Sequence, residues 1–156
     1  MDQILFGKTP QELKEIVIRL GLPAFTAKQI ADWLYKKQIN HIDEMTNLSL
    51  KAREILKADY SFGTVPPSSV SISTDGTKKY LYHVGSNRFV EAAYIPDRDR
   101  ATLCVSSQVG CRMGCRFCMT ARQGFQSNLS AGDIVNQIRS LPERENLTNI
   151  VYMGMG

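Results

Sequence analysis

Apolar residues recur at helical spacing through the first 60 positions of the chain. Thr9-Pro10-Gln11-Glu12 forms a helix-capping box with proline at the first helical position, and Gly21 ends the segment that follows. Two further helices are predicted, one starting at Thr26 and one running from about Ser49 to Lys57. The residues expected to face the core on the three helices are Leu13, Ile16, Val17 and Leu20, then Ile30, Trp33 and Leu34, then Leu50, Ile55 and Leu56.

The period of the pattern changes from helical to alternating after the Pro66-Pro67 pair. Asp75-Gly76 and Gly85-Ser86-Asn87 are typical hairpin turns, so the segments around them are predicted to form an antiparallel meander. A helix with Ser130 as its N-cap follows, and its expected apolar stripe is Ile134, Val135 and Ile138. The predicted strands cover residues 70–74, 80–84, 89–95, 100–106 and 149–153, the last of which is expected to be buried.

The strand, loop, helix and strand in the last third of the chain make one βα unit of a parallel sheet. We therefore predict an α/β fold in three parts: a helical accessory domain over residues 1–62, a β-meander over 63–99, and the start of a core domain over 100–156. A single βα unit cannot cover both faces of a parallel sheet, and the chain ends on Gly154-Met155-Gly156. We expect an amino-terminal fragment of a longer enzyme. The alternative is a complete small protein that oligomerises to gain its missing strands, so the oligomeric state stays open.

The composition is that of an ordinary globular protein, with 43% hydrophobic and 22% charged residues in a chain of 156. The apolar runs fall far short of the roughly 18–20 residues that span a bilayer, and the first residues do not resemble a secretory signal. We therefore expect a cytoplasmic protein without a membrane partner. The net charge of +4 is concentrated in residues 63–128, which carry eight Lys or Arg against four Asp or Glu. Such an excess suits RNA, but charge alone favours a solvated surface.

Three of the four cysteines lie within eight residues, as Cys111-x3-Cys115-x2-Cys118. Without a secretory signal, metal binding or redox chemistry explains such a cluster better than a disulfide framework does. Iron–sulfur clusters are held by cysteine thiolates, usually four of them. Three thiolates can hold a four-iron cluster and leave one iron open to a substrate or cofactor, so the spacing predicts a cluster that takes part in chemistry.

Zinc is the alternative for the same cysteines. A structural zinc site uses four ligands, and Cys104 could supply the fourth, with His41 and His83 as remote candidates. In that case the chain would be a zinc-stabilised RNA-binding module rather than part of an enzyme.

The cysteine segment and its surroundings resemble one family, the RlmN/Cfr-type radical SAM RNA adenine methyltransferases. Phe117 stands where the radical SAM cluster motif has an aromatic residue, and Val109 favours the RlmN branch. Met119 and Ser127 depart from the family pattern, which has Ser or Ala and Arg at these positions. The resemblance is strong over roughly residues 88–156. The stretches that carry it are Val90-Glu91, Tyr94-Ile95-Pro96, residues 100–118, Gly124-Phe125, Asn128-Leu129 and Tyr152-Met153-Gly154-Met155-Gly156.

This resemblance implies a helical accessory domain followed by a radical SAM (β/α)6 partial barrel, truncated here after its first βα unit. It implies a dual-specificity enzyme that methylates C2 of an adenine in 23S rRNA and in tRNA through a methyl-cysteine intermediate. The implied cofactors are a [4Fe-4S] cluster and S-adenosyl-L-methionine (SAM), and the implied partners include an electron donor such as flavodoxin. A radical route is needed because C2 of adenine is too electron-poor to attack the methyl sulfonium directly.

The resemblance also implies a role for each matching residue. Cys111, Cys115 and Cys118 would hold the cluster, and Gly154, Met155 and Gly156 would contact SAM. Glu91 would accept the C2 proton, and Cys104 would resolve the protein–RNA link through a transient disulfide. The alternatives are that Glu91 is a solvent-facing strand residue and that Cys104 is a buried strand residue. Because the methyl-carrying cysteine of the family lies beyond residue 156, we expect the fragment alone to be inactive.

Overall fold

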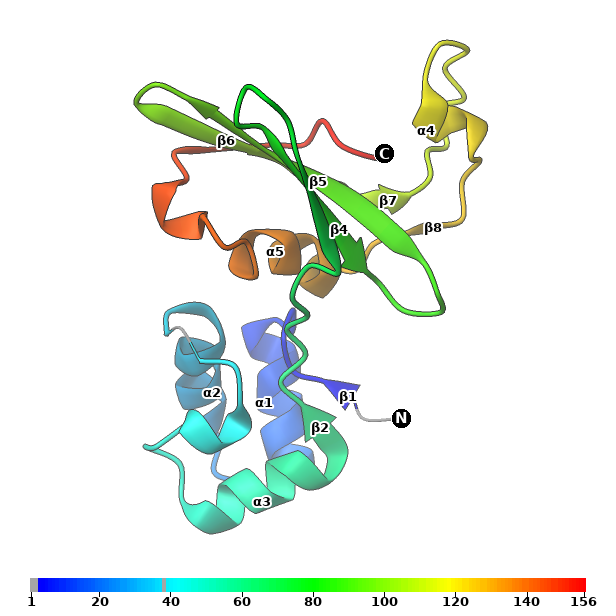
Figure 1. Cartoon of the computed structure of the whole chain (residues 1–156). Coiled ribbons are helices and arrows are strands. Elements are labelled where there is room, and N and C mark those ends of the chain that lie inside the picture. Colours follow the sequence, from blue (N-terminus) through cyan, green and yellow to red (C-terminus); the bar gives the residue numbers. More distant parts are fainter. Residues whose placement is uncertain (1–2, 38) are drawn as a thin grey trace. The chain divides into compact units, whose positions relative to one another are not determined.

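The computed structural model describes residues 3–37 and 39–156. The chain divides into two compact units, Met1–Thr64 and Val65–Gly156 (Figure 1). Within the described ranges, no helix has the length and apolar character needed to cross a membrane.

The first unit is built from three short α-helices and a two-stranded parallel pairing of its ends. Leu5 and Phe6 extend the pairing, since their N–H groups donate to the carbonyls of Ser61 and Phe62 at 3.0 Å each. The elements are β1 Gln3–Ile4, α1 Pro10–Arg19, α2 Thr26–Tyr35, a 3-10 turn Ile42–Glu44, α3 Leu50–Asp59 and β2 Tyr60–Ser61.

The capping box predicted at the start of α1 is confirmed. The Thr9 hydroxyl accepts a hydrogen bond from the Glu12 N–H at 3.3 Å, and the Glu12 carboxylate accepts one from the Thr9 N–H at 2.7 Å. The apolar stripe Leu13, Ile16 and Val17 is buried as predicted. The second helix also begins at Thr26 as predicted, but no side chain caps it, because the N-cap position is Phe25, whose ring has no hydrogen-bonding atom.

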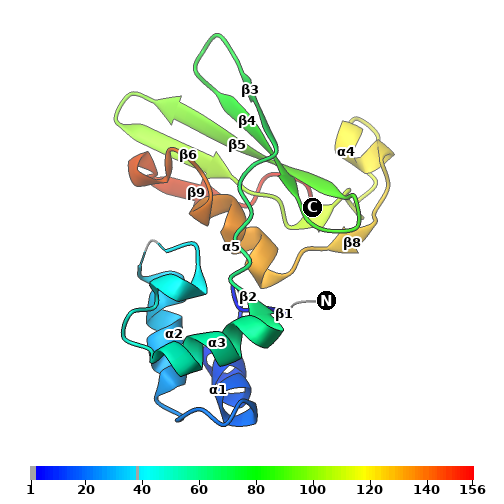
Figure 2. The same ribbon diagram turned by 60° about the horizontal axis from the view of Figure 1, so that its bottom comes forward.

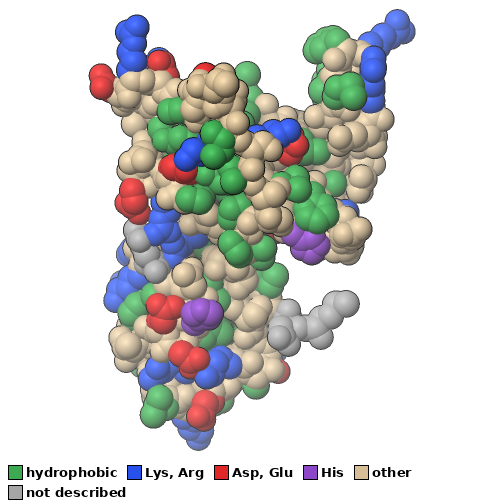
Figure 3. Space-filling model, in the orientation of Figure 1, with side chains coloured by type: hydrophobic (Ala, Val, Ile, Leu, Met, Phe, Trp, Pro, Cys, Tyr) green, Lys and Arg blue, Asp and Glu red, His purple; other side chains and the backbone are tan. Residues whose placement is uncertain are grey.

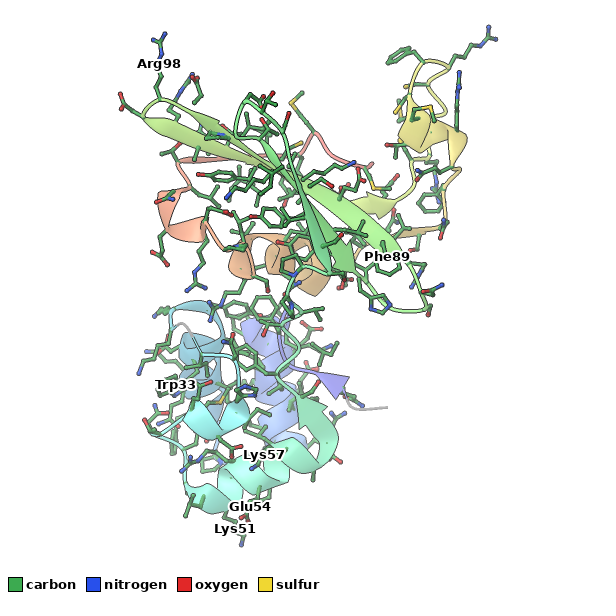
Figure 4. The ribbon with its side chains drawn as sticks, viewed as in Figure 1. Trp33, Lys51, Glu54, Lys57, Phe89 and Arg98 are labelled. Carbon is green, nitrogen blue, oxygen red and sulfur yellow. The ribbon has the colours of Figure 1, made fainter. Side chains whose placement is uncertain are left out.

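The prediction for α3 is correct for one end of the helix and wrong for the other. Ser49 caps the helix and Leu56 is fully buried, whereas Leu50 is 70% exposed. Each helical residue turns about 100° around the axis, so Leu50 and Leu56 lie about 120° apart and cannot both face the core. Leu50 shares the solvent side with Lys51 and Glu54 (Figure 4).

The second unit is a five-stranded mixed sheet with α5 packed on one face (Figure 2). The strand order is β3-β4-β5-β6-β9; the first four strands are antiparallel, and β9 runs parallel to β6. The sheet strands are β3 Ser69–Ile72, β4 Lys78–His83, β5 Phe89–Asp97, β6 Arg100–Cys104 and β9 Asn149–Val151. The elements between β6 and β9 are β7 Gln108–Val109, α4 Met119–Arg122, β8 Ser127–Asn128, α5 Ala131–Arg139 and a 3-10 turn Arg144–Asn146. The predicted meander and the predicted βα unit thus share one sheet, in an α/β fold.

Alternation along the strands gives this sheet two different faces. The covered face packs against α5 and the turn after it, through Ile138 and Leu141. The open face carries side chains that are partly or fully exposed. The covered face presents Tyr80, Tyr82, Val90, Ala92, Tyr94 and Leu103, and the open face presents Lys79, Leu81, Glu91, Ala93 and Cys104.

Two predictions about the last elements are wrong in part. The strand predicted to be buried over residues 149–153 ends at Val151, and Tyr152 and Met153, which follow it, are 67% and 78% exposed. Within β9, Ile150 is 46% exposed, since the strand lies at the edge of the described sheet. On α5, the predicted apolar stripe is wrong at Val135, which is exposed, and right at Ile138, which packs against the core; the buried positions are the amides Asn136 and Gln137.

A partly buried polar cluster holds the turn after α5 to β4. The Glu143 carboxylate accepts hydrogen bonds from Lys78 Nζ at 2.5 Å and from the Tyr80 hydroxyl at 2.7 and 2.8 Å. Desolvation raises the pKa of Glu143, but the hydrogen bonds from Lys78 and Tyr80 outweigh it, so the pKa lies below its ordinary value of 4.5. Burial and the Glu143 carboxylate raise the pKa of Tyr80, which keeps its hydroxyl a donor.

The exposure difference along α3 gives a matched pair of variants. Leu56→Ala should lower the free energy of unfolding by about 2–5 kcal/mol, because it opens a cavity at a fully buried site. Leu50→Ala on the same helix should change it by less than about 0.5 kcal/mol. Urea unfolding followed by circular dichroism measures both, and equal costs for the two variants would contradict this description of α3.

The Glu143 cluster should make the second unit sensitive to acid. A carboxyl whose pKa is lower in the folded state stabilises the fold above its unfolded pKa, and that stability is lost as pH falls through the folded pKa. We expect Glu143→Gln to cost about 2 kcal/mol at pH 7 and progressively less below pH 4.5. Urea titrations of both proteins across this range measure the difference; a constant difference would rule out the ionic contribution.

Candidate functional site

The three clustered cysteines lie on a loop that begins after β7 and returns at β8. Its base is narrow, because Gln126 N–H donates to the Val109 carbonyl at 2.9 Å. Gly110 has a φ of 72°, and a Cβ there would lie 1.7 Å from the carbonyl oxygen of Gly124. Arg112 also stacks over the Phe125 ring at 4.3 Å. The two arms of the loop therefore meet directly above β7 and β8, and only glycine fits at the contact.

All three loop thiols are free and partly exposed. Cys111 Sγ accepts the Met113 N–H at 3.4 Å. Cys118 precedes α4 and accepts a hydrogen bond from the Ala121 N–H and further hydrogen bonds from Thr120, which hold the pKa of this thiol below its ordinary value of 9.0. Thiolate is the form that binds metals, so the donor chemistry suits a cluster.

The thiols are not, however, gathered into a closed site. Among residues 3–37 and 39–156, no group of three or more His, Cys, Asp or Glu side chains stands ready to hold a metal ion. Cys104 lies on the sheet, apart from this loop in sequence and fold. The residue types fit an iron–sulfur cluster, while the geometry that would enclose one is not formed by the described residues alone.

The tip of the cysteine loop exposes apolar and basic side chains together (Figure 3, over the region of α4). Phe117 is 91% exposed, and Met113 and Met119 are 79% and 67% exposed. Large exposed apolar groups of this kind mark contact surfaces rather than core.

Glu91 and Cys104 lie on the open face of the sheet, on adjacent strands. Cys104 pairs with Ala93 in the β5–β6 register, which puts it diagonal to Glu91, with Cα atoms roughly 7–8 Å apart. The Glu91 side chain is half-exposed and forms an ion pair with Lys79 at 3.0 Å. The ends of β5 are seen in Figure 4, where Phe89 marks its start and Arg98 the turn after it.

The Gly154-Met155-Gly156 segment lies against the stretch that joins β6 to the cysteine loop. The Gly154 N–H donates to the Val105 carbonyl at 3.1 Å, and the Met155 carbonyl accepts from the N–H groups of Ser107 and Gln108 at 2.9 and 3.0 Å. A Cβ on Gly154 would lie 2.6 Å from Ser106 Oγ and 2.7 Å from the Val105 oxygen. Glycine is needed here because two stretches of backbone approach each other closely.

The structure thus brings one pair of predicted site residues together and places the predicted glycine segment beside the stretch before the cysteine loop. Glu91 and Cys104 share one face, and the glycine segment meets the stretch that leads into the cysteine loop. Sequence reasoning missed Ser106 and Gln137, which are fully buried polar residues at this junction. The available signal was a pair of adjacent amides, Asn136 and Gln137, within a helix otherwise marked by Ile and Val.

Comparison with known proteins agrees with the resemblance found in the sequence. The family model described as the ribosomal RNA large subunit methyltransferase N-terminal domain, RlmN_N, matches residues 4–61. The probable dual-specificity RNA methyltransferase RlmN of Bacteroides thetaiotaomicron is 62% identical over 152 residues, which cover 97% of this chain and 44% of that protein. The dual-specificity RNA methyltransferase RlmN of Geotalea uraniireducens is 44% identical over 148 residues, which cover 95% and 43%.

A crystal structure of a radical SAM methyltransferase from Sphaerobacter thermophilus superimposes with a TM-score of 0.84 at 36% identity, and the match covers 99% of this chain and 47% of that one. The chain therefore spans less than half the length of the relatives that it matches. By sequence over nearly all of its residues, and by fold, the chain belongs to the RlmN family.

Proposed function

We propose that this chain is part of a radical SAM enzyme that methylates C2 of an adenine in 23S rRNA and in tRNA, in the cytoplasm. The observation that carries the proposal is the C-x3-C-x2-C loop with its three free thiols. The loop follows β6, whose Cys104 lies on the same face of the sheet as Glu91. The relatives named as dual-specificity RNA methyltransferases support it, since they match 95–97% of the chain.

In this proposal Cys111, Cys115 and Cys118 hold a [4Fe-4S] cluster. When bound, the cluster supplies the single electron that cleaves SAM, delivered by a donor such as flavodoxin. The Gly154–Gly156 segment binds SAM through its backbone, because its hydrogen bonds to residues 105–108 hold it beside the start of the cysteine loop.

Glu91 is the proposed proton acceptor for the C2 hydrogen. Its carboxylate lies on the open face and is half-exposed, so it is accessible to an adenine placed on that face. The Lys79 ammonium 3.0 Å away holds the carboxylate in place through an ion pair that costs little to rearrange, since both side chains reach solvent.

Cys104 is the proposed resolving cysteine. Its thiolate attacks the sulfur of a second cysteine, outside residues 1–156, that links the protein to the methylated adenine. An S–S bond forms, the S–C bond breaks, and the carbon keeps the electron pair and takes up a proton, which completes the methyl group. The position of Cys104 diagonal to Glu91 supports this role, because proton removal and bond cleavage then occur on one face.

The test of the metal assignment is anaerobic reconstitution of the RlmN-length protein that carries this sequence. We expect about four iron per chain in the wild type, and loss of most of that iron in Cys118→Ala. Cys104→Ala is the matched control, and it should keep its iron because its thiol is not a ligand. A zinc-stabilised RNA-binding module predicts the reverse: stoichiometric zinc without iron, and weaker zinc binding in Cys104→Ala.

The catalytic role of Glu91 gives a second prediction. Glu91→Gln removes the base but keeps the shape, so RNA methylation should fall at least about 100-fold while SAM cleavage continues. Asp97→Asn, an exposed carboxylate on the same strand, should methylate at the wild-type rate. Mass spectrometry of the adenine and of the cleaved SAM separates the two activities, and normal methylation by Glu91→Gln would exclude it as the base.

A further inference from the structure

Ser106 is a polar residue with no exposed surface, two residues after the end of β6, and its hydroxyl joins two segments of the candidate site. The hydroxyl donates to the Glu91 carbonyl at 2.6 Å and accepts the Met155 N–H at 2.9 Å. One oxygen therefore connects the strand that carries Glu91 to the glycine segment at the other side of the junction.

The backbone of Ser106 is in turn fixed by the side chain of Gln137, which is also fully buried. The Gln137 side-chain oxygen accepts the Ser106 N–H at 2.8 Å, and its amide nitrogen donates to the Ser106 carbonyl at 2.9 Å. The Tyr82 hydroxyl donates to the Gln137 backbone carbonyl at 3.1 Å. Gln137 thus replaces the strand partner that Ser106 lacks. Through this side chain, α5 fixes the position of the Ser106 backbone.

A buried hydroxyl with two protein partners is satisfied, and removing it leaves two orphaned groups. The Glu91 carbonyl would lose a donor, and the Met155 N–H would lose its acceptor. The tight contact of Gly154 with Ser106 Oγ means that the glycine segment rests directly on this hydroxyl. The hydroxyl is therefore a spacer as well as a hydrogen-bonding group.

We propose that Ser106, held by Gln137, is a positioning residue that sets the placement of the Gly154–Gly156 segment relative to Glu91. The inference rests on the proposed function, in which that segment binds SAM and Glu91 takes the adenine proton. Two reactive groups that belong to different segments need a fixed separation for efficient transfer, and a shared buried hydrogen-bonding atom provides one.

The first test needs no cofactor. In Ser106→Ala, amide hydrogen exchange at Met155 should be faster by about fivefold, because its acceptor is gone. Ser140→Ala is the matched control. The Ser140 hydroxyl, at the end of α5, donates to the Asn136 side chain at 2.8 Å and has no hydrogen bond to the glycine segment. Unchanged exchange at Met155 in Ser106→Ala would overturn the inference.

The second test uses the RlmN-length holoprotein with its cluster reconstituted. Ser106→Ala should weaken SAM binding by about fivefold to tenfold, measured by the SAM-induced change in the spectrum of the reduced cluster, at unchanged iron content. It should also lower the fraction of SAM cleavages that end in methylated adenine. A purely structural role predicts normal SAM affinity and coupling in the molecules that retain the cluster.

Gly154→Ala keeps the experiment decisive if Ser106→Ala does not fold. Its added Cβ would collide with Ser106 Oγ and push the segment off the hydroxyl without removing it, so it should reproduce both the faster Met155 exchange and the weaker SAM binding. If the wild-type holoprotein fails to methylate RNA, the proposed function is wrong; if it methylates and neither variant changes exchange or SAM affinity, only this inference is wrong.

Discussion

The architecture around the candidate site depends on the side-chain amide of Gln137, which makes the two backbone hydrogen bonds that a neighbouring strand would otherwise make. Past Cys104 the chain leaves the regular ladder of the sheet, and Gln137 takes over the pairing by bonding both the N–H and the carbonyl of Ser106. Because Gln137 has no exposed surface, water cannot compete for these bonds. Everything that follows β6, including the base of the cysteine loop, begins from a backbone position fixed by α5. Asn136 does the same for Val65 at the start of this unit, with bonds of 2.8 and 2.9 Å.

The two faces of the sheet divide stability from chemistry. Tyrosines 80, 82 and 94 fill the covered face, and two of them use their hydroxyls to bind α5 or the turn after it. The open face carries Glu91 and Cys104, the proposed proton acceptor and the proposed resolving cysteine. Alternation along β5 makes this division automatic, since neighbouring residues of a strand point to opposite faces. Val90 and Ala92 anchor the strand, and Glu91 between them is left accessible.

Much of the fold follows from local sequence, and the failures have physical causes. Capping boxes at Thr9 and Ser130, hairpin turns and strand alternation act over a few residues, so the helix starts and the meander could be predicted. Leu50 and the end of β9 were misjudged because burial depends on which neighbours the fold supplies. The α/β class and the family were within reach of the sequence. The Ser106–Gln137 contact was not, because it joins residues 31 positions apart through polar groups that no apolar periodicity marks.

The pinched base of the cysteine loop has a consequence for metal capture. Because Gly110 packs against the Gly124 carbonyl, the loop is already closed at its base, and binding of the proposed cluster would not have to supply that loop-closure entropy. Three sulfur donors tethered within eight residues of each other would then present a high effective concentration of thiolate to the proposed cluster. In the proposed enzyme, Cys111, Cys115 and Cys118 would hold the cluster on a loop whose base is already closed by the Gly110–Gly124 contact.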